Sequence, residues 1–414
     1  MFENKKLIKK SRIGKACIVA LFVNGMLANT VQANSNVESL PYTAGNFDIF
    51  GRLDVSLGYG DNVFRGSIVE ESSTFLTVSP TIKAVNETAT HRLSFDYNGE
   101  GTTFFESRDD GYISSELGAE YVAKLSPTSE LGFGIGYEDG NSVRGTDFLE
   151  GTNSVVDGAT EFENVVFRTN YFVGSQKIGP VLELGFEYSD LEFENFGLFT
   201  NGRDRSTTKL SARLGYQYSV ATQFFVDLVY QDFDYDGVIN NFAGSLDNDE
   251  TRVEVGVKWR ATSQTSGEVS IGVTDKTFDF GEFEDINDSS SITSWNAAIN
   301  WDPTSRDKVS FKTFSRPFEQ TGTGLFIDVQ EYSVSWNHQL SPRWGFNVEL
   351  ATGSADFEGT PREDDYDSYR FGVDYQPSRH SALSLDFRRE EKESATQIFD
   401  FDSNSIVLTY STSL

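Results

Sequence analysis

The sequence contains few side chains that could carry out covalent chemistry. It has three histidines, His91, His338 and His380, and a single cysteine, Cys17. A serine hydrolase needs its nucleophilic serine within hydrogen-bond reach of a histidine that a third group orients. Ser335 precedes His338 in the stretch SWNHQL, but their odd spacing in a strand sends the two side chains to opposite faces. We therefore predict that the protein is not an enzyme.

Sites for cofactors and metals are equally sparse. The sequence has no phosphate-binding loop, no zinc-ligand spacing and no EF-hand loop, so no cofactor is expected. Acidic stretches such as EFEDIND, residues 282–288, either bind Ca²⁺ loosely or are simply solvated. The formal net charge of −29 argues against nucleic acid as a partner.

The first 33 residues have the pattern of a secretory signal peptide. Basic residues dominate positions 1–15, an apolar run follows from Ala16 to Ala28, and small residues lead to Ala33. The apolar run is shorter than the ~20 residues that a membrane-spanning helix needs. Cleavage after Ala33 would remove Cys17, so the exported chain is expected to contain no disulfide.

Beyond residue 50 one pattern recurs, in which apolar and polar residues alternate. RVEVGVKWRA, residues 252–261, has apolar residues at every second position, and ELGFGIGY, residues 130–137, alternates them with glycine. A period of two is that of a β-strand whose two faces meet different surroundings. Eighteen such segments of about ten residues each begin near residues 51, 74, 91, 113, 130, 163, 179, 207, 223, 251, 267, 292, 307, 329, 344, 368, 382 and 405.

The connections between these segments alternate in length. Short turns such as SPTSE, residues 126–130, alternate with longer acidic stretches such as residues 232–250. This rhythm predicts an all-β protein, a transmembrane antiparallel β-barrel of about 18 strands with short periplasmic turns and long extracellular loops. A secreted soluble β-protein is the alternative, because a sandwich also alternates. The predicted organisation is a signal peptide (1–33), a short N-terminal periplasmic segment (34–50) and an outer-membrane barrel (51–414).

The polar face of the predicted strands would line the lumen. Eighteen strands spaced ~4.8 Å apart and tilted by ~40° close on a barrel roughly 35 Å across, which side chains cannot fill. A water-filled channel, open or narrowed by loops, is expected. The predicted pore-lining residues are Arg168, Arg213, Arg252, Lys258, Arg260, Lys308, Lys312, Glu116, Glu120, Glu183, Asp227, Glu254, Asn296 and Asn300.

Five of these cations suggest a positive stripe in the lumen. Arg213, Arg252, Lys258, Lys308 and Lys312 come from the eighth, tenth and thirteenth predicted strands. A stripe of this sign would guide an anionic sugar polymer, and the neighbouring amides could hydrogen-bond to its hydroxyls. Alternatively, the same cations pair with acidic residues and only stiffen the wall.

The first strand and its turn resemble a known family. GYGDNVFRGS followed by LTVSPTIKA resembles the outer-membrane β-barrel porins associated with exopolysaccharide and capsule operons. The residues that carry the resemblance are Tyr59, Asp61, Asn62, Phe64, Arg65, Ser79 and Pro80. In a structural role, Asp61 and Asn62 would form a turn, Phe64 would pack and Arg65 would pair with an acid. In a functional role, these residues would contact a passing polymer.

The resemblance implies an exit channel for an exopolysaccharide or capsular polymer in the bacterial outer membrane. Long loops of similar length favour such a wide exit. A passive diffusion porin for small solutes, which typically folds one long loop into its lumen, is an alternative, and so is a structural or adhesive barrel. Expected partners are outer-membrane lipid and lipopolysaccharide, the polysaccharide, a periplasmic polysaccharide-export protein and the barrel-assembly machinery.

Overall fold

A computed structural model describes most of the chain. It covers residues 41–151, 157–175, 177–237, 245–260, 264–279, 289–319 and 324–413. The predicted signal peptide and the acidic stretch 282–288 therefore lie outside the described residues. Within the described part, no helix is long and apolar enough to cross a membrane.

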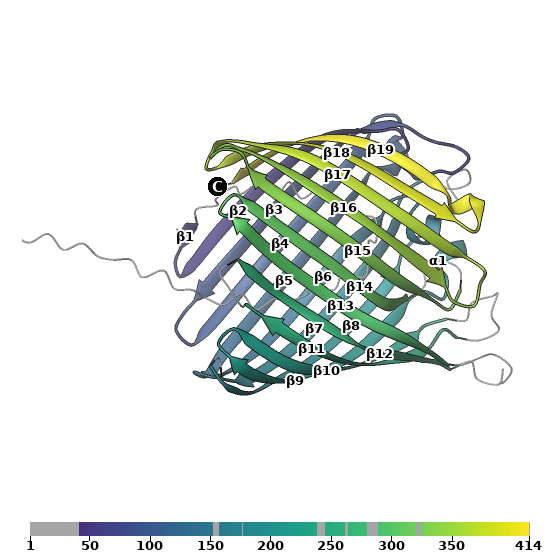
Figure 1. Cartoon of the computed structure of the whole chain (residues 1–414). Helices are drawn as coiled ribbons and strands as arrows, with labels where there is room; N and C mark the ends of the chain where they lie inside the picture. The colour runs from purple at the N-terminus through teal and green to yellow at the C-terminus, as the bar shows by residue number, and fades with distance from the viewer. Residues whose placement is uncertain are drawn as a thin grey trace, which may run out of the picture.

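Eighteen strands form one closed antiparallel barrel (Figure 1). Each strand pairs with its neighbours in sequence, and the last strand, β19, pairs with β2 from Ser405↔Gly60 to Ser413↔Arg52. The strands are β2 (Phe47–Gly60), β3 (Ser73–Glu87), β4 (His91–Phe104), β5 (Tyr112–Ser126), β6 (Ser129–Ser142), β7 (Thr160–Gly174), β8 (Gly179–Phe193), β9 (Arg205–Ser219), β10 (Thr222–Tyr235), β11 (Asn248–Trp259), β12 (Thr265–Phe278), β13 (Ser289–Thr304), β14 (Asp307–Glu319), β15 (Phe326–Gln339), β16 (Trp344–Phe357), β17 (Glu363–Ser378), β18 (Ser381–Ser394) and β19 (Phe401–Ser413). The predicted fold and strand number are confirmed.

The faces of the strands explain why the barrel belongs in a membrane. Apolar side chains point outward and are exposed in the isolated chain, as shown by Ile135 at 58%, Leu214 at 53% and Val255 at 56%. Polar and charged side chains alternate with them and point into the lumen. Because water would penalise such an apolar outer surface, the barrel wall requires lipid around it.

The strands are longer than predicted, mainly at the end where the long loops lie. They contain 12 to 16 residues, and β17 begins at Glu363 rather than near residue 368. Hydrogen bonding between strands continues beyond the apolar band, where nothing imposes a hydrophobic period. The alternating pattern therefore predicted only the part of each strand that faces lipid, and it missed the part that extends beyond the membrane.

The N-terminal boundary also differs from the prediction. β1 (Tyr42–Ala44) forms a hairpin with the start of β2, and Gly45 adopts a left-handed φ of +62° in its turn. β2 begins at Phe47, so residues 47–50 belong to the barrel and not to a separate segment. Ile49 and Phe50 are adjacent apolar residues that interrupt the alternation, which is why this part of the strand escaped the pattern.

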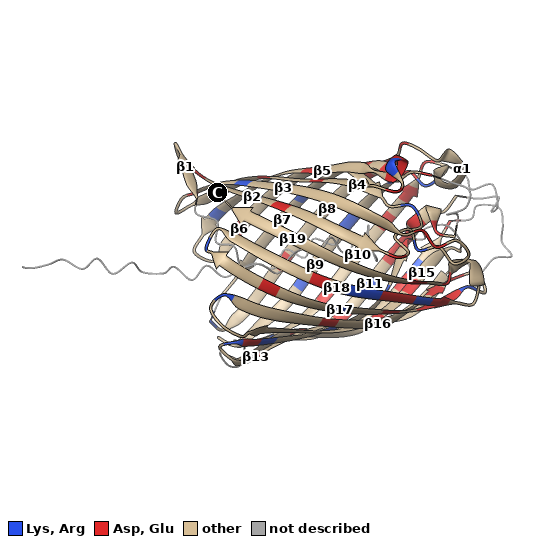
Figure 2. Cartoon of the chain, turned by 90° about the horizontal axis from the view of Figure 1, so that it is seen from above, with Lys and Arg blue, Asp and Glu red and all other residues tan. Residues whose placement is uncertain are grey.

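The long loops are unequal in length, contrary to the sequence-based expectation. Residues 143–159 connect β6 to β7, whereas residues 358–362 suffice between β16 and β17. The described parts of these connections contain four short helical turns: η1 (Arg108–Asp110), η2 (Asp147–Leu149), α1 (Gly197–Thr200) and η3 (Gln397–Phe399). Figure 2 shows acidic residues gathered among the loops at this end, and charges of both signs along the strands. Similar loop length is therefore no argument for a wide exit.

The orientation of β9 gives a direct test of the membrane assignment. Leu214→Arg places a charge on the lipid-facing side near the middle of the strand and should cost about 2–4 kcal/mol of folding free energy in a bilayer. Ser211→Arg is the matched control on the lumen side of the same strand and should cost little. Urea titration of folding into lipid vesicles, read by the heat-modifiable gel shift, measures both. Equal losses for the two variants would contradict a lipid-facing Leu214.

Candidate functional site

The predicted pore-lining residues lie on the lumen face of the described strands, except Arg260, which follows the end of β11. They are Glu116 and Glu120 on β5, Arg168 on β7, Glu183 on β8, Arg213 on β9, Asp227 on β10, Arg252, Glu254 and Lys258 on β11, Asn296 and Asn300 on β13, and Lys308 and Lys312 on β14. Asn296, Asn300, Lys308 and Lys312 are exposed there. A channel role for this set remains a proposal.

Most cations of the predicted stripe are neutralised within the wall. Arg213 forms ion pairs of 2.7 Å with Asp227 and Glu268, and Lys258 lies 3.4 Å from Glu268. Arg252 lies 4.0 Å from Glu254. Among the described residues, Lys308 and Lys312 form no ion pair, but both stand on β14, three strands from β11. These contacts fit wall pairing better than a continuous positive stripe.

The Asp-Asn pair of the family-like motif closes the barrel seam. Asp61 Oδ1 accepts a hydrogen bond of 2.7 Å from the backbone N–H of Asn404, and Asp61 Oδ2 accepts one of 2.8 Å from the Asn404 side chain. Asn62 donates to the carbonyls of Gly66 and Asp402 at 2.8 and 2.9 Å. The turn after β2 is thereby joined to β19 beyond the last strand pair, Ser405↔Gly60.

The next two motif residues turn inward. Phe64 is 1% exposed, and its ring centre lies 5.1 Å from that of Phe104. Arg65 has a left-handed φ of +53° and donates to Glu390 on the lumen face of β18 at 3.0 Å. Tyr59, by contrast, points outward and is 48% exposed. These contacts match the structural role considered for the motif, namely a turn, a packed ring and an ion pair at the rim.

The Ser-Pro pair interrupts the pairing of β3 with β4. The register runs through Val78↔Gly101 and resumes at Thr81↔Asn98, with Ser79 and Pro80 unpaired between them. Pro80 has no N–H to donate to β4, while its pairing with Leu53 of β2 is retained. Ser79 faces the lumen and Pro80 faces outward, so the two residues form no common site.

The seam contact carries a stability prediction. Asn62 is 1% exposed, so Asn62→Ala leaves the buried backbone groups of Gly66 and Asp402 without their partner. We expect a loss of about 2–4 kcal/mol of folding free energy. Urea titration in vesicles measures it, with Asn296→Ala, an exposed lumen amide, as the control. A loss no larger than that of the control would contradict the seam role.

The connection between β6 and β7, here called the mouth segment (residues 143–159, of which 152–156 are outside the described residues), is anchored by Arg144. This side chain is 2% exposed and binds both Glu71 oxygens at 3.0 and 2.9 Å. It also donates to Asp110 at 3.0 Å, and its guanidinium lies 3.9 Å from the ring centre of Phe64. Burial by itself lowers the pKa of Arg144, but the carboxylates of Glu71 and Asp110 more than offset this effect and raise it. The Arg144 guanidinium thus joins the mouth segment to the loop between β2 and β3, through Glu71, and to the loop between β4 and β5, through Asp110.

Further along, the mouth segment reaches another part of the wall. Glu150 forms ion pairs with Lys392 and Arg362. Lys392 is a lumen-facing residue of β18, which is six strand positions from β6 around the barrel. The contact therefore has to be made from within the lumen. On its other side, Phe148 packs edge-on against Phe193 at the end of β8, with 5.0 Å between ring centres. The described residues 144–150 of the mouth segment therefore cross the lumen at the long-loop end.

A second segment leaves the wall where β13 and β14 separate. Their pairing ends at Trp295↔Ser315, although β13 continues beside β12 to Ser289 and β14 continues beside β15 to Glu319↔Phe326. Pro317 lies just beyond the point of separation and has no N–H for a β13 partner. We call the separated part the tip hairpin, comprising residues 316–319 and 324–329.

The tip hairpin packs on the inner wall of β10–β12, on the far side of β13. Glu319 accepts hydrogen bonds from Lys276 of β12, from Tyr235 of β10 and, at 3.2 Å, from Asn248 of β11. Lys276 is fully buried, and its Nζ lies 4.5 Å from the ring centre of Phe233.

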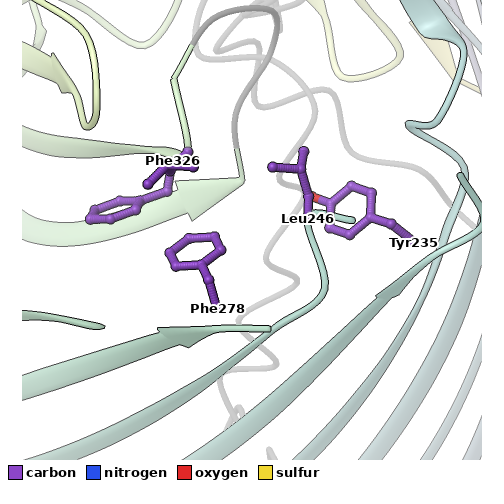
Figure 3. Close-up of a cluster of buried hydrophobic side chains, with 5 residues drawn as sticks. Tyr235, Leu246, Phe278 and Phe326 are labelled. Atoms are coloured by element: carbon purple, nitrogen blue, oxygen red, sulfur yellow. The ribbon is translucent and has the colours of Figure 1, made fainter. Parts of the chain in front are cut away.

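An apolar cluster completes this attachment (Figure 3). It contains Tyr235, Leu246, Phe278, Leu325 and Phe326, and the rings of Phe278 and Phe326 stack with 6.0 Å between their centres. A buried ion pair and an apolar cluster together hold the tip hairpin inside the lumen.

A cavity remains between the tip hairpin and the inner wall. Arg316 and Phe318 of the tip hairpin line it on one side, and lumen-facing residues of β5 to β11 line it on the other. Of the predicted pore-lining residues, Glu116, Arg168 and Arg252 take part. In the described chain, no group of three or more His, Cys, Asp or Glu side chains is arranged to hold a metal ion.

Sequence reasoning missed the mouth segment and the tip hairpin. Arg144 and Asp110, which are buried, and Glu150, which is ion-paired, stand in loops without periodicity, so these contacts have no local signature. Two signals were nonetheless present. Pro317 is unusual inside a strand whose N–H groups should all be paired, and residues 143–159 form a longer connection than any neighbouring loop.

Comparison with known proteins identifies the family. A family model described as "Putative beta-barrel porin 2" matches residues 37–413. The chain belongs to this β-barrel porin family. The porin has no match among curated proteins. Its fold and family are those of outer-membrane β-barrel porins, so its long loops are extracellular and its short turns periplasmic.

Solved structures resemble the porin only distantly. OccAB2 of Acinetobacter baumannii is 14% identical with a TM-score of 0.46, over 88% of this chain and 98% of that one. The copper transporter OprC is 8% identical with a TM-score of 0.48, over 90% of this chain and 81% of that one. The FrpB iron transporter from Neisseria meningitidis is 10% identical with a TM-score of 0.46, over 83% of this chain, which spans 62% of the transporter's length.

Proposed function

We propose that this porin passes small polar solutes through a lumen narrowed at its extracellular end. The observation that carries the proposal is the pairing of Glu150 with Lys392, which draws the mouth segment across the lumen to a wall strand six positions away. The tip hairpin enters the lumen separately and is held by Glu319 and Lys276. Two segments in a barrel roughly 35 Å across leave room for solutes but not for an unobstructed wide exit.

Export of an exopolysaccharide or capsular polymer is the second candidate function. The motif from Tyr59 to Pro80 resembles porins of polysaccharide operons, and the exposed lumen amides Asn296 and Asn300 could hydrogen-bond to sugar hydroxyls. A polymer would have to displace the mouth segment to leave the barrel. This candidate includes a periplasmic polysaccharide-export protein as partner. For either function, lipopolysaccharide would surround the barrel, the barrel-assembly machinery would insert it, and residues 1–33 would be removed as a signal peptide.

Liposome swelling tests the first candidate. Vesicles containing the folded porin should swell quickly in arabinose or glucose, more slowly in sucrose and raffinose, and not in a dextran of polymer size. Swelling by the dextran at a rate close to that of glucose would overturn the narrowed lumen. Absence of swelling by every solute, with correctly folded protein, would favour the structural or adhesive alternative.

Gene deletion separates the two candidates in the cell. A diffusion porin predicts slower uptake of small solutes with the surface polysaccharide intact. If the deletion strain instead retains polymer inside and loses it from the surface, the export candidate replaces the first. Complementation with the wild-type gene should restore the affected property, and N-terminal sequencing of the purified porin tests processing after Ala33.

A further inference from the structure

Three cations converge on the cavity beneath the tip hairpin. Lys209 on β9 and Arg252 on β11 face the lumen, and Arg316 of the tip hairpin comes to the same cavity from the other side. Their charges are close enough to interact unfavourably with one another. Only the infolding of β14 brings Arg316 here, because in a regular wall β14 would stand three strands from β11.

Nearby acidic residues neutralise this group only in part. Glu187 forms an ion pair with Arg168, whose Nε lies 2.6 Å from the carboxylate oxygen. Glu319 forms an ion pair with Lys276. Glu250 also lines the cavity and accepts a hydrogen bond from Gln231 at 3.3 Å. Among the described residues, Lys209 and Arg316 form no ion pair, while Arg252 has only the 4.0 Å contact with Glu254. Glu116 and Glu138 also line the cavity, from β5 and β6, and form no ion pair among the described residues. Lys209, Arg252 and Arg316 therefore gather on the side of β9, β11 and the tip hairpin, three or more strands away from these two carboxylates.

Two residues that line the cavity also carry unsatisfied polar atoms. Arg316 Nε and Asn164 Oδ1 are buried and have no hydrogen-bond partner among the described residues. Buried polar groups are normally paired, so such atoms at a cavity wall mark places where a bound molecule could complete the hydrogen bonding. Phe318, which lies under the Arg316 guanidinium at 4.9 Å, adds an apolar surface beside the charges.

We propose that Lys209, Arg252 and Arg316 form a binding site inside the lumen for a small organic anion, a sugar-sized molecule with a carboxylate or phosphate group. The inference rests on the proposed diffusion function. It names the class of solute that binds transiently in the lumen while it diffuses through the porin. A guanidinium can bind either anion with two hydrogen bonds, and Lys209 adds a third charged donor. Asn164 supplies an acceptor for a hydroxyl group of the same solute.

Binding to the folded porin in detergent tests this site without requiring transport. Isothermal titration should detect binding of glucuronate and glucose 6-phosphate but no binding of glucose. The anion with the higher affinity shows whether the site prefers a carboxylate or a phosphate. Arg316→Gln and Lys209→Gln should each weaken this binding about tenfold, the usual effect of one lost hydrogen bond to a charged group. Lys312→Gln is the matched control, because Lys312 faces the lumen on the same strand as Arg316 but lies outside the cavity.

The outcomes separate the site from the proposed function. Equal binding of glucose and both anions, or equal affinity in Arg316→Gln and Lys312→Gln, would overturn the site even if vesicles swell normally. Binding that is lost in Arg316→Gln and recovered in Arg316→Lys would support it even if swelling fails. Arg316→Lys also guards against misfolding, since it keeps the charge while removing the planar donor pair.

Discussion

Lys276→Met should increase the single-channel conductance of the reconstituted porin. Lys276 is fully buried and supplies the cation for Glu319, which is itself buried and anchors the tip hairpin. Removing one partner of a buried ion pair costs about 3–5 kcal/mol, because the other charge is left uncompensated. The carboxylate of Glu319 can regain water if the tip hairpin swings out of the lumen. A cost of this size shifts that equilibrium by a factor of about 100 or more.

Two further variants make this result specific. Lys312→Met removes an exposed lumen lysine and should leave the conductance close to the wild-type value. Lys276→Met combined with Glu319→Leu replaces both charges by apolar groups, which is often tolerated in a buried site, and should return the conductance toward wild type. An unchanged conductance in folded Lys276→Met would show that the tip hairpin does not obstruct the ion path.

Arg144→Met should raise the size limit of the porin in liposome swelling. Arg144 joins Glu71 and Asp110 to the mouth segment by ion pairs, and Asp110, which is 1% exposed, also accepts a hydrogen bond of 2.8 Å from the backbone N–H of Gly158. Loss of the guanidinium leaves Asp110 buried without its cation, which should destabilise the joined loops by about 3–5 kcal/mol. The mouth segment keeps its contacts through Glu150 and Phe148 but loses its anchor at Arg144. It should therefore leave the lumen more often, and raffinose should enter at a rate nearer that of glucose.

A surface arginine provides the comparison for this variant. Arg389 stands on the outer face of β18, where it pairs with Glu391 in an exposed position. Because exposed ion pairs contribute little, Arg389→Met should leave the swelling rates unchanged. A size limit that stays at the wild-type value in Arg144→Met, with the gel shift of a folded barrel, would mean that the mouth segment is not the constriction.

The wall of the barrel was largely predictable from the sequence. The alternation in residues 252–261 and 130–137 predicted strands with two different faces. It arises because lipid favours apolar side chains on one face and water favours polar side chains on the other. The same parity placed Arg213, Asp227 and Asn296 on the lumen face. The motif resemblance correctly indicated a β-barrel porin, and its suggested turn, packed ring and ion pair correspond to the contacts of Asn62, Phe64 and Arg65.

The contents of the lumen were not predictable in this way. Parity assigns a residue to a face, but it does not tell which charges will meet across the barrel. Parity left open whether Arg213 pairs within the wall or faces the channel, and the structure pairs it with Asp227 and Glu268. Parity also gave no sign that Arg316 would join Lys209 in one cavity. The loops carry no repeating pattern, so the inward course of residues 144–150 left no periodic signal.

By itself, the sequence determined the fold class, the number of strands and the face on which each strand residue lies. These properties depend on neighbours one or two positions apart and on the solvent that each face meets. Only the tertiary structure decided that Glu150 reaches Lys392 and that Glu319 reaches Lys276. Such contacts join residues far apart in the chain, and they form because a closed wall brings loops from different strands together over one lumen, where buried charges must find partners.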